Sequence, residues 1–284
     1  MTVVKQRELQ QVLTQGIEQA RRTSANVLVS QSMRVPSVDP LSFFACGKQD
    51  RFFWEDPDGK AVASGHGVAW RLFAEGERRF QKIEQQRNEL LGNSVIDADP
   101  SVPAVGPLFL GGFSFDPVKK KTELWRSFLD ADLVLPVFML TVAGDEAWLT
   151  INCVVSPEEN LEQKAKKLLV QRDRLLEDCR NFQMEQKNAP LFAVTEVLPE
   201  QWKNAVQDAA REIRDGIIDK VVLSRELQLS TEQSFSPTQV LARLRREQPN
   251  SFLFAIERNG SCFLGASPER LVKRNGNELF SSCI

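Results

Sequence analysis

The sequence predicts an α+β protein built around an antiparallel sheet. Segments with helical periodicity are interspersed with strand-like segments, and short turns join most of the strand-like segments as in hairpins. The chain has 284 residues, of which 42% are hydrophobic and 26% charged. A chain of this size and composition can bury a large core without a disulfide or a structural metal.

The first third of the chain predicts two helices and a set of short strands. Apolar residues recur at helical spacing between Leu9 and Ala20, which indicates an amphipathic helix. A charged helix is predicted over residues 75–91, with its inner face formed by Phe80, Ile83 and Leu90. Short apolar runs and turn residues predict strands at 27–29, 52–54 and 61–70, a turn at 56–59 and an exposed loop at 92–105.

The middle third predicts three strands followed by a long helix. The strands cover residues 108–115, 134–143 and 147–155. Ser156, Pro157 and Glu159 form the pattern of an N-cap, a proline in the first turn and a capping box, so we expect the helix to begin there. Its apolar residues continue at periods of three and four as far as Phe182.

The last third alternates between helices and strands. Helices are predicted from Trp202 to Ile213, ended by Gly216, and from Ser236 to Pro249. Strands are predicted at 218–229, 252–256 and 262–264, with turns at Asn259-Gly260 and Asn275-Gly276. Residues 277–284 also have strand character but no cap, turn or polar tail, so we expect either a short edge strand or a chain that stops before its fold does.

Composition excludes several classes of function. The 36 basic and 38 acidic residues give a net charge of −2, without the basic excess of a nucleic-acid-binding protein. The longest apolar stretch, residues 134–143, is too short for a membrane span, and Lys5, Arg7 and Glu8 argue against a signal peptide. We therefore expect no nucleic-acid partner, no membrane contact and a cytoplasmic location.

Cysteine and histidine usage narrows the chemistry further. The five cysteines are scattered and unpaired in sequence, which is typical of thiols in a reducing cytosol and not of a zinc site: Cys46, Cys153, Cys179, Cys262 and Cys283. The single histidine, His66, lies between two glycines, and we interpret it as a surface residue in a turn. Because tyrosine is absent, acid–base chemistry would fall to Lys, Asp, Glu or Cys. No metal-ligand spacing is visible, so no metal site is predicted within this chain.

Three segments could carry chemistry, although each also has a structural explanation. Lys220 opens the predicted strand 218–229, where a solvated strand end is the simpler interpretation. Glu269 follows the Gly265-Ala266-Ser267-Pro268 corner, where it could equally be an exposed acid beside Arg270. Residues 109–117 combine glycines with aromatic residues but lack a phosphate-binding pattern, which favours a strand packed closely against another backbone, with at most a pocket-wall role.

Together these segments resemble a known family. Residues 220–225, Lys-Val-Val-Leu-Ser-Arg, and 265–269, Gly-Ala-Ser-Pro-Glu, resemble the two signature stretches of the chorismate-utilising enzymes. With residues 111–117, Trp125 and Phe128 added, the whole chain is most similar to the isochorismate synthases of menaquinone biosynthesis. The resemblance implies an antiparallel β-sandwich core with outer helices, and the conversion of chorismate to isochorismate with Mg²⁺.

The resemblance also implies roles for the two charged residues. Lys220 corresponds to the general base that activates water for attack at C2 of chorismate, and Glu269 to the general acid that protonates the departing 4-hydroxyl. The base has to be mostly neutral and the acid mostly protonated, and burial of both groups favours these states. We therefore expect the two side chains to line a common dry cavity. Lysine at this position accompanies water as the nucleophile, which disfavours the ammonia-using relatives.

The sequence also departs from the family pattern. Relatives continue past Ile284 through the Mg²⁺-binding glutamates and the basic residues that hold the substrate carboxylates. We therefore expect residues 1–190 to form an amino-terminal α+β region and residues 191–284 to form the truncated start of the chorismate-binding catalytic region. This chain alone should be weakly active or inactive. A salicylate synthase-type lyase and a non-catalytic binding fragment remain alternatives, and the oligomeric state is open.

Overall fold

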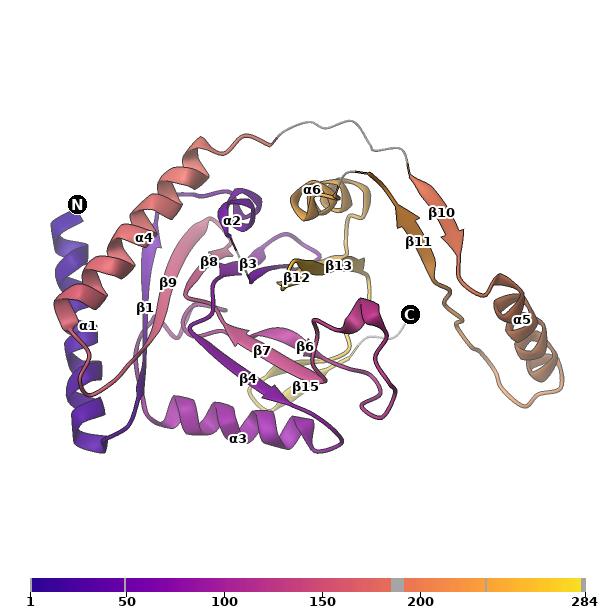
Figure 1. The fold of residues 1–284 in the computed structure, drawn as a ribbon, viewed down its shortest axis with the longest axis horizontal. Coiled ribbons are helices and arrows are strands. Elements are labelled where there is room, and N and C mark those ends of the chain that lie inside the picture. Colours follow the sequence, from indigo (N-terminus) through magenta and orange to yellow (C-terminus); the bar gives the residue numbers. More distant parts are fainter. Residues whose placement is uncertain (1, 49, 185–191, 233, 282–284) are drawn as a thin grey trace. The chain divides into compact units, whose positions relative to one another are not determined.

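A computed structural model describes residues 2–48, 50–184, 192–232 and 234–281 of the chain (Figure 1). The chain divides into two compact units, the first comprising Met1–Met184 with Pro237–Ile284 and the second comprising Glu185–Ser236. The domain boundary predicted between residues 190 and 191 falls outside the described residues and stays a prediction. No helix in the described ranges is long and apolar enough to cross a membrane.

An eight-stranded sheet forms the centre of the first unit. Its order is β13-β12-β2-β3-β8-β9-β1-β5, so strands from both ends of the chain share one sheet. All its pairs are antiparallel except β1 with β5, which is parallel. The strands are β1 (Val27–Val35), β2 (Arg51–Glu55), β3 (Ala61–His66), β5 (Ser94–Asp97), β8 (Phe138–Ala143), β9 (Glu146–Val155), β12 (Phe252–Arg258) and β13 (Ser261–Ser267).

Helices cover one face of this sheet because alternate strand residues on that face are apolar. The cross-strand row Met33, Leu149, Leu140 and Phe53 belongs to this face. It lies under the apolar stripes of α1 (Thr2–Thr23) and α4 (Leu161–Asn181), and of α2 (Pro40–Cys46) and α6 (Pro237–Glu247). Leu13 of α1 and Leu241 of α6 are completely buried.

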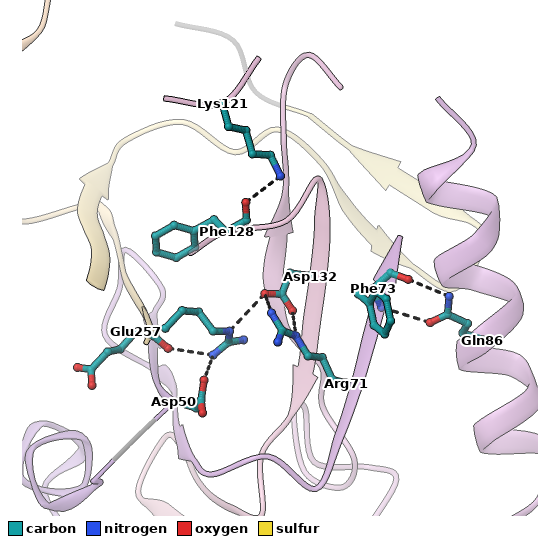
Figure 2. Close-up of polar contacts among 9 residues, drawn as sticks. Asp50, Arg71, Phe73, Gln86, Lys121, Phe128, Asp132 and Glu257 are labelled. Carbon is teal, nitrogen blue, oxygen red and sulfur yellow. Dashed lines mark hydrogen bonds and ion pairs between the residues drawn. The ribbon is translucent and has the colours of Figure 1, made fainter. Parts of the chain in front are cut away.

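A second, three-stranded sheet of order β4-β7-β6 lies beside α3 (Arg79–Gly92). Its strands are β4 (Trp70–Ala74), β6 (Leu110–Phe113) and β7 (Ala131–Leu135), and a 3₁₀ helix, η1, covers Glu123–Trp125. Leu72, Ile83 and Ala131 form a small core between this sheet and α3. Gln86 of α3 binds both the amide and the carbonyl of Phe73 and so covers the open edge of β4 (Figure 2).

Two predicted strands each divide into two at a sharp corner, where the chain passes from one sheet to the other. Residues 61–70 form β3 and the start of β4, with Gly67 at φ +73° between them, and residues 134–143 form parts of β7 and β8 around Pro136. The corners pack together, since a Cβ on Gly65 would lie 2.7 Å from Pro136 Cγ. A bent pair of strands that connects two sheets in this way is a known solution to packing one sheet on another.

Other sequence-based expectations were wrong in detail. The long helix begins at Leu161 with Asn160 as its N-cap, which accepts a hydrogen bond from the amide of Gln163, and not at Ser156. The expected loop 92–105 contains β5, and the expected inward residue Phe80 is 54% exposed and stacks on Phe113. Helix α2 was not predicted, because seven residues are too few to establish a period.

The second unit is small. It contains the two-stranded ribbon of β10 (Ala193–Glu196) with β11 (Leu227–Ser230) and the helix α5 (Pro199–Arg214). At the end of the first unit, β14 (Lys273–Asn275) pairs with β15 (Glu278–Phe280) around Gly276 at φ +59°, as the predicted turn requires. Residues 282–284 of the predicted terminal strand lie outside the described residues.

Candidate functional site

Lys220 lies in the second unit, in the irregular segment between α5 and β11, and its side chain is exposed. The strand predicted over 218–229 was wrong for most of its length, because only Leu227–Ser230 is a strand. A strand needs a partner, and β10 provides only four residues, which pair with those of β11. The alternation of faces expected for residues 220–226 is therefore absent.

One arginine connects the elements around Lys220. Arg225 forms an ion pair with Glu196 of β10 at 3.2 Å. Its guanidinium also makes a cation–π contact with Trp202 of α5, 5.4 Å from the centroid of the ring. The amide of Val197 donates to the carbonyl of Glu226 at 3.2 Å. These contacts hold the Lys220 segment to both α5 and the ribbon.

Glu269 lies in the first unit, just after the edge strand β13, and is exposed. The Ser267 hydroxyl accepts a hydrogen bond from the Glu269 amide at 3.4 Å and donates to its carbonyl at 3.2 Å, which makes a small turn around Pro268. Arg270 stacks on Phe252 at 5.0 Å, at the start of the neighbouring strand. A short, hydrogen-bonded corner thus carries the carboxyl group, as the sequence predicts.

Gly265 leaves room for an aromatic ring in the hairpin before the corner. A Cβ on Gly265 would lie 2.9 Å from the ring of Phe254, which is its partner across β12 and β13. The same ring contacts Phe263, which in turn contacts Trp125 at 5.1 Å and Phe128 at 6.3 Å. The aromatic residues downstream of the glycine-rich segment therefore pack against the hairpin that precedes Glu269.

The close backbone approach predicted for the glycine-rich segment 109–117 is present at Gly111. A Cβ on Gly111 would lie 1.9 Å from the carbonyl oxygen of Asp132. The backbones of β6 and β7 can therefore come this close only because residue 111 is glycine. Arg79 of α3 donates to the carbonyl of Ser114 at 2.9 Å and holds the end of the segment.

An ionic cluster of the buried Asp132 and Arg258 with the partly exposed Arg71 and Asp50 was not predicted from the sequence. Asp132 of β7 accepts hydrogen bonds from Arg71 of β4 at 2.7 and 2.6 Å and from Arg258 of β12 at 3.4 Å (Figure 2). Arg258 also donates to Asp50 at 3.3 Å and lies 4.3 Å over the ring of Phe52. The cluster therefore joins the β12–β13 hairpin to the three-stranded sheet.

Arg258 is only 1% exposed, so carboxylates and not water have to compensate its positive charge. Burial lowers the pKa of the guanidinium, while the carboxylates of Asp132 and Asp50 act in the opposite direction. The sequence could have indicated that Asp132 is buried, because this acid interrupts an otherwise apolar strand, which is typical of a buried acid with a partner. It could not have indicated that Arg258 is buried, because Arg258 precedes an Asn-Gly turn, where charged residues are usually solvated.

His66 is not the surface residue expected from its glycine neighbours. It ends β3, and its ring contacts those of Phe43 at 5.3 Å and Phe138 at 5.7 Å. Burial, with a further contribution from Arg51, lowers the pKa of His66 to about 4. It has a packing role.

The cysteines of the described ranges are free thiols, as predicted: Cys46, Cys153, Cys179 and Cys262. Burial raises the pKa of Cys153 to about 12 and that of Cys262 to about 11, so both are poor nucleophiles. Cys283 lies outside the described residues.

The structure describes Lys220 and Glu269 separately, each within its own unit. The expected cavity shared by the two side chains, and their roles as base and acid, therefore stay predictions. Within the described ranges no group of three or more His, Cys, Asp or Glu side chains could hold a metal ion.

Comparisons with known proteins agree with the resemblance in the signature segments. Residues 15–284 match the family model described as "Chorismate binding enzyme". The whole chain is 32% identical to the isochorismate synthase MenF of Bacillus subtilis and covers 62% of it. It is also 30% identical, over 95% of its length, to the salicylate biosynthesis isochorismate synthase of Pseudomonas aeruginosa, of which it covers 56%.

A solved structure supports the fold. The menaquinone-specific isochorismate synthase MenF of Escherichia coli superposes with a TM-score of 0.59 at 21% identity, over 93% of this chain and 57% of that one. The chain thus spans about three fifths of the length of these relatives. It is a mixed α+β chain with a large mixed sheet, and it belongs to the chorismate binding enzyme family.

Proposed function

We propose that this chain is part of an isochorismate synthase, an isomerase that converts chorismate to isochorismate. The observation that carries the proposal is the match of the whole chain, at 32% identity, to the Bacillus subtilis isochorismate synthase. The Lys220 and Glu269 segments resemble the family's signature stretches and both lie within the region matched by the family model.

In the proposed reaction Lys220 accepts a proton from water as the water oxygen forms a bond to C2 of chorismate. The ring double bonds shift and the bond from C4 to its hydroxyl oxygen breaks. Glu269 donates the proton with which that hydroxyl leaves as water. One water is consumed and one is released, so substrate and product are isomers. Each proton transfer removes an obstacle, since water is a weak nucleophile and hydroxide a poor leaving group.

The surroundings of the two residues suit parts of this task. The Ser267 hydroxyl and the stiff Pro268 hold the backbone of Glu269 in a defined turn. Arg225 holds the Lys220 segment to α5 and β10 through Trp202 and Glu196. Both catalytic side chains are exposed in the described structure, so the proposal requires that substrate or further polypeptide removes them from water.

The metal belongs to the proposal in a limited way. Family resemblance implies Mg²⁺, but the described residues offer no cluster of ligands that fits a divalent ion. We therefore assign no Mg²⁺ ligand to this chain and derive no step through the ion.

We also propose that the enzyme serves menaquinone biosynthesis and is located in the cytoplasm. In the complete protein we expect a β-sandwich core with outer helices. The corners at Gly65 and Pro136, where strands pass from one sheet to the other, support a sandwich. The chain by itself should be weakly active or inactive, because about two fifths of the Bacillus subtilis relative has no counterpart in it.

A covalent chimera tests this function. Residues 1–284 replace the matching part of the Bacillus subtilis enzyme, and the purified chimera is incubated with chorismate and Mg²⁺. We expect isochorismate without pyruvate, and a loss of at least about a hundredfold in kcat for Lys220→Ala and for Glu269→Gln. Pyruvate release would instead favour the salicylate synthase-type lyase. A folded chimera that leaves chorismate unchanged would contradict the proposed function.

A further inference from the structure

The corner that carries Glu269 is held by contacts on both sides of this residue. Before it, the Ser267 hydroxyl bonds to the amide and the carbonyl of Glu269 at 3.4 and 3.2 Å. After it, the guanidinium of Arg270 lies 5.0 Å from the centroid of the Phe252 ring. Phe252 and Ser267 are partners across β12 and β13, so both contacts lie at the same end of one hairpin.

Arg270 turns back onto the protein, whereas the residues beside it do not. It is half-buried, while Glu269 is exposed and Leu271 is 88% exposed. If this segment were simply covered as a whole, the apolar leucine would be buried before the charged arginine. The placement of Arg270 therefore comes from specific contacts, and a guanidinium over an aromatic ring is a contact of this kind.

The ring under Arg270 is itself part of the large sheet. Phe252 begins β12, and its ring lies 6.1 Å from that of Trp54 on the neighbouring strand β2. The next residues along β12 are in the core, since Leu253 is 3% exposed and Ala255 is completely buried. Arg270 thus stacks on a platform that the sheet holds in place.

A general acid depends on such placement. The carboxyl group has to come within hydrogen-bonding distance of the oxygen that leaves, and a displacement of about 1 Å can cost a hundredfold in rate. Pro268 fixes one backbone angle of the corner, and the contacts of Ser267 and Arg270 fix its two ends. Together they set the direction in which the side chain of Glu269 leaves the backbone.

We propose that Arg270 is a positioning residue for Glu269, and that it acts by stacking on Phe252. This inference rests on the proposed function, because Glu269 is the general acid of that reaction. Arg270 itself contributes no proton. Its planar guanidinium suits the role better than a lysine would, because an ammonium group has no plane to lay on the ring.

The first test measures order in the chain as it stands. Arg270→Gln removes the stack, and Arg274→Gln is the matched control, because Arg274 donates to the carbonyl of Gly276 in the next turn, at 2.8 Å. We expect the backbone order parameter of Glu269, measured by nuclear magnetic resonance, to fall below about 0.6 in Arg270→Gln and to stay at the parent value in Arg274→Gln. An unchanged order parameter in Arg270→Gln would overturn the proposal.

The second test measures turnover in the chimera with the Bacillus subtilis enzyme. We expect Arg270→Gln to lower kcat at least about tenfold with less than about a twofold change in KM, and Arg274→Gln to change neither by more than about twofold. Arg270→Lys, which keeps the charge, should resemble Arg270→Gln more than the parent.

A double-mutant cycle separates positioning from a general structural role. In a chimera that already carries Glu269→Gln, adding Arg270→Gln should cost less than about twofold, because the group that Arg270 positions is gone. An equal loss in both backgrounds would overturn the proposal, and so would a raised KM with unchanged kcat, which would make Arg270 a substrate-binding residue. A costly Glu269→Gln beside a silent Arg270→Gln would contradict the positioning alone. Parent turnover by Glu269→Gln would contradict the proposed role of Glu269 itself.

Discussion

At the scale of single residues, Asp132 is the most informative side chain in the described structure. It is 6% exposed and accepts hydrogen bonds from two arginines, one of them buried. Buried ion pairs contribute little net stability relative to apolar replacements, but removal of one partner leaves a charge in an apolar setting. The cost of a substitution should therefore depend on which charge is left behind.

We predict an order of destabilisation within the cluster. Asp132→Ala should lower the free energy of unfolding by about 3–5 kcal/mol, because Arg258 keeps only Asp50 as a carboxylate partner. Arg258→Met should cost less, about 1–3 kcal/mol, since Asp132 keeps Arg71. Arg71→Ala should cost about 1 kcal/mol or less, because its side chain is 37% exposed. Urea unfolding followed by circular dichroism measures all three, and an Asp132→Ala variant as stable as Arg71→Ala would contradict this account.

A second prediction concerns pH and His66. Its pKa is about 4 in the folded chain against 6.5 as the ordinary value, so the unfolded chain binds more protons between these limits. The contribution of His66 to the free energy of unfolding is therefore fully present above about pH 6.5. As the pH falls toward 4, this contribution decreases by up to about 3 kcal/mol. His66→Gln should remove this part of the slope. Parallel unfolding curves of parent and variant across the window measure the difference, and an unchanged slope would show that His66 does not titrate as described.

Residue roles could be predicted from the sequence only where the local pattern determines them. Gly111 was expected at a close backbone approach, and the space beside it leaves no room for a Cβ. His66 could not be placed, because its burial arises from Phe43 and Phe138, which lie far away in the chain. Arg258 was missed for the same reason, since Asp132 lies 126 positions away. The roles of Lys220 and Glu269 stay predictions.

At the scale of elements, the close approach of β6 and β7 requires a glycine at position 111. Gly111→Ala would place a Cβ against the Asp132 carbonyl, and backbone cannot move aside as a flexible side chain can. We expect a loss of at least about 2 kcal/mol of unfolding free energy. The matched control is Gly112→Ala, which has no neighbour within 4 Å of the new Cβ and should change stability by less than about 1 kcal/mol. Equal effects in thermal unfolding would argue against the close approach.

Prediction of the elements succeeded where one strong period ran through the segment. The stripes of α1, α4 and α5 and the hairpin β12–β13 were found in this way. The strand at 218–229 failed because apolar alternation indicates a strand only where a partner strand is available, and β10 is short. The parallel pair β1–β5 was missed because Ser94–Asp97 is only four residues long, lies in a segment rich in Asp, Ser and Pro, and gains strand structure from its long-range pairing.

At the scale of the whole molecule, the two units differ in how they are stabilised. The first has two hydrophobic core clusters between its helices and the eight-stranded sheet, whereas none of the described residues of the second unit is buried. Stability should therefore be uneven, with α5 and the ribbon opening far more readily than the sheet. In the isolated chain, hydrogen exchange should be at least about a hundredfold faster in α5 than in β9. Comparable protection in both elements would contradict this division.

The central claim is that Lys220 activates water for addition to chorismate, and labelled water tests it most directly. The chimera described above is incubated with chorismate in water enriched in heavy oxygen, and the isochorismate is analysed by mass spectrometry. The account predicts one solvent oxygen in the product, bonded to C2, and its loss together with turnover in Lys220→Ala. Isochorismate that forms without solvent oxygen, or that the Lys220→Ala chimera forms at the parent rate, would contradict the claim.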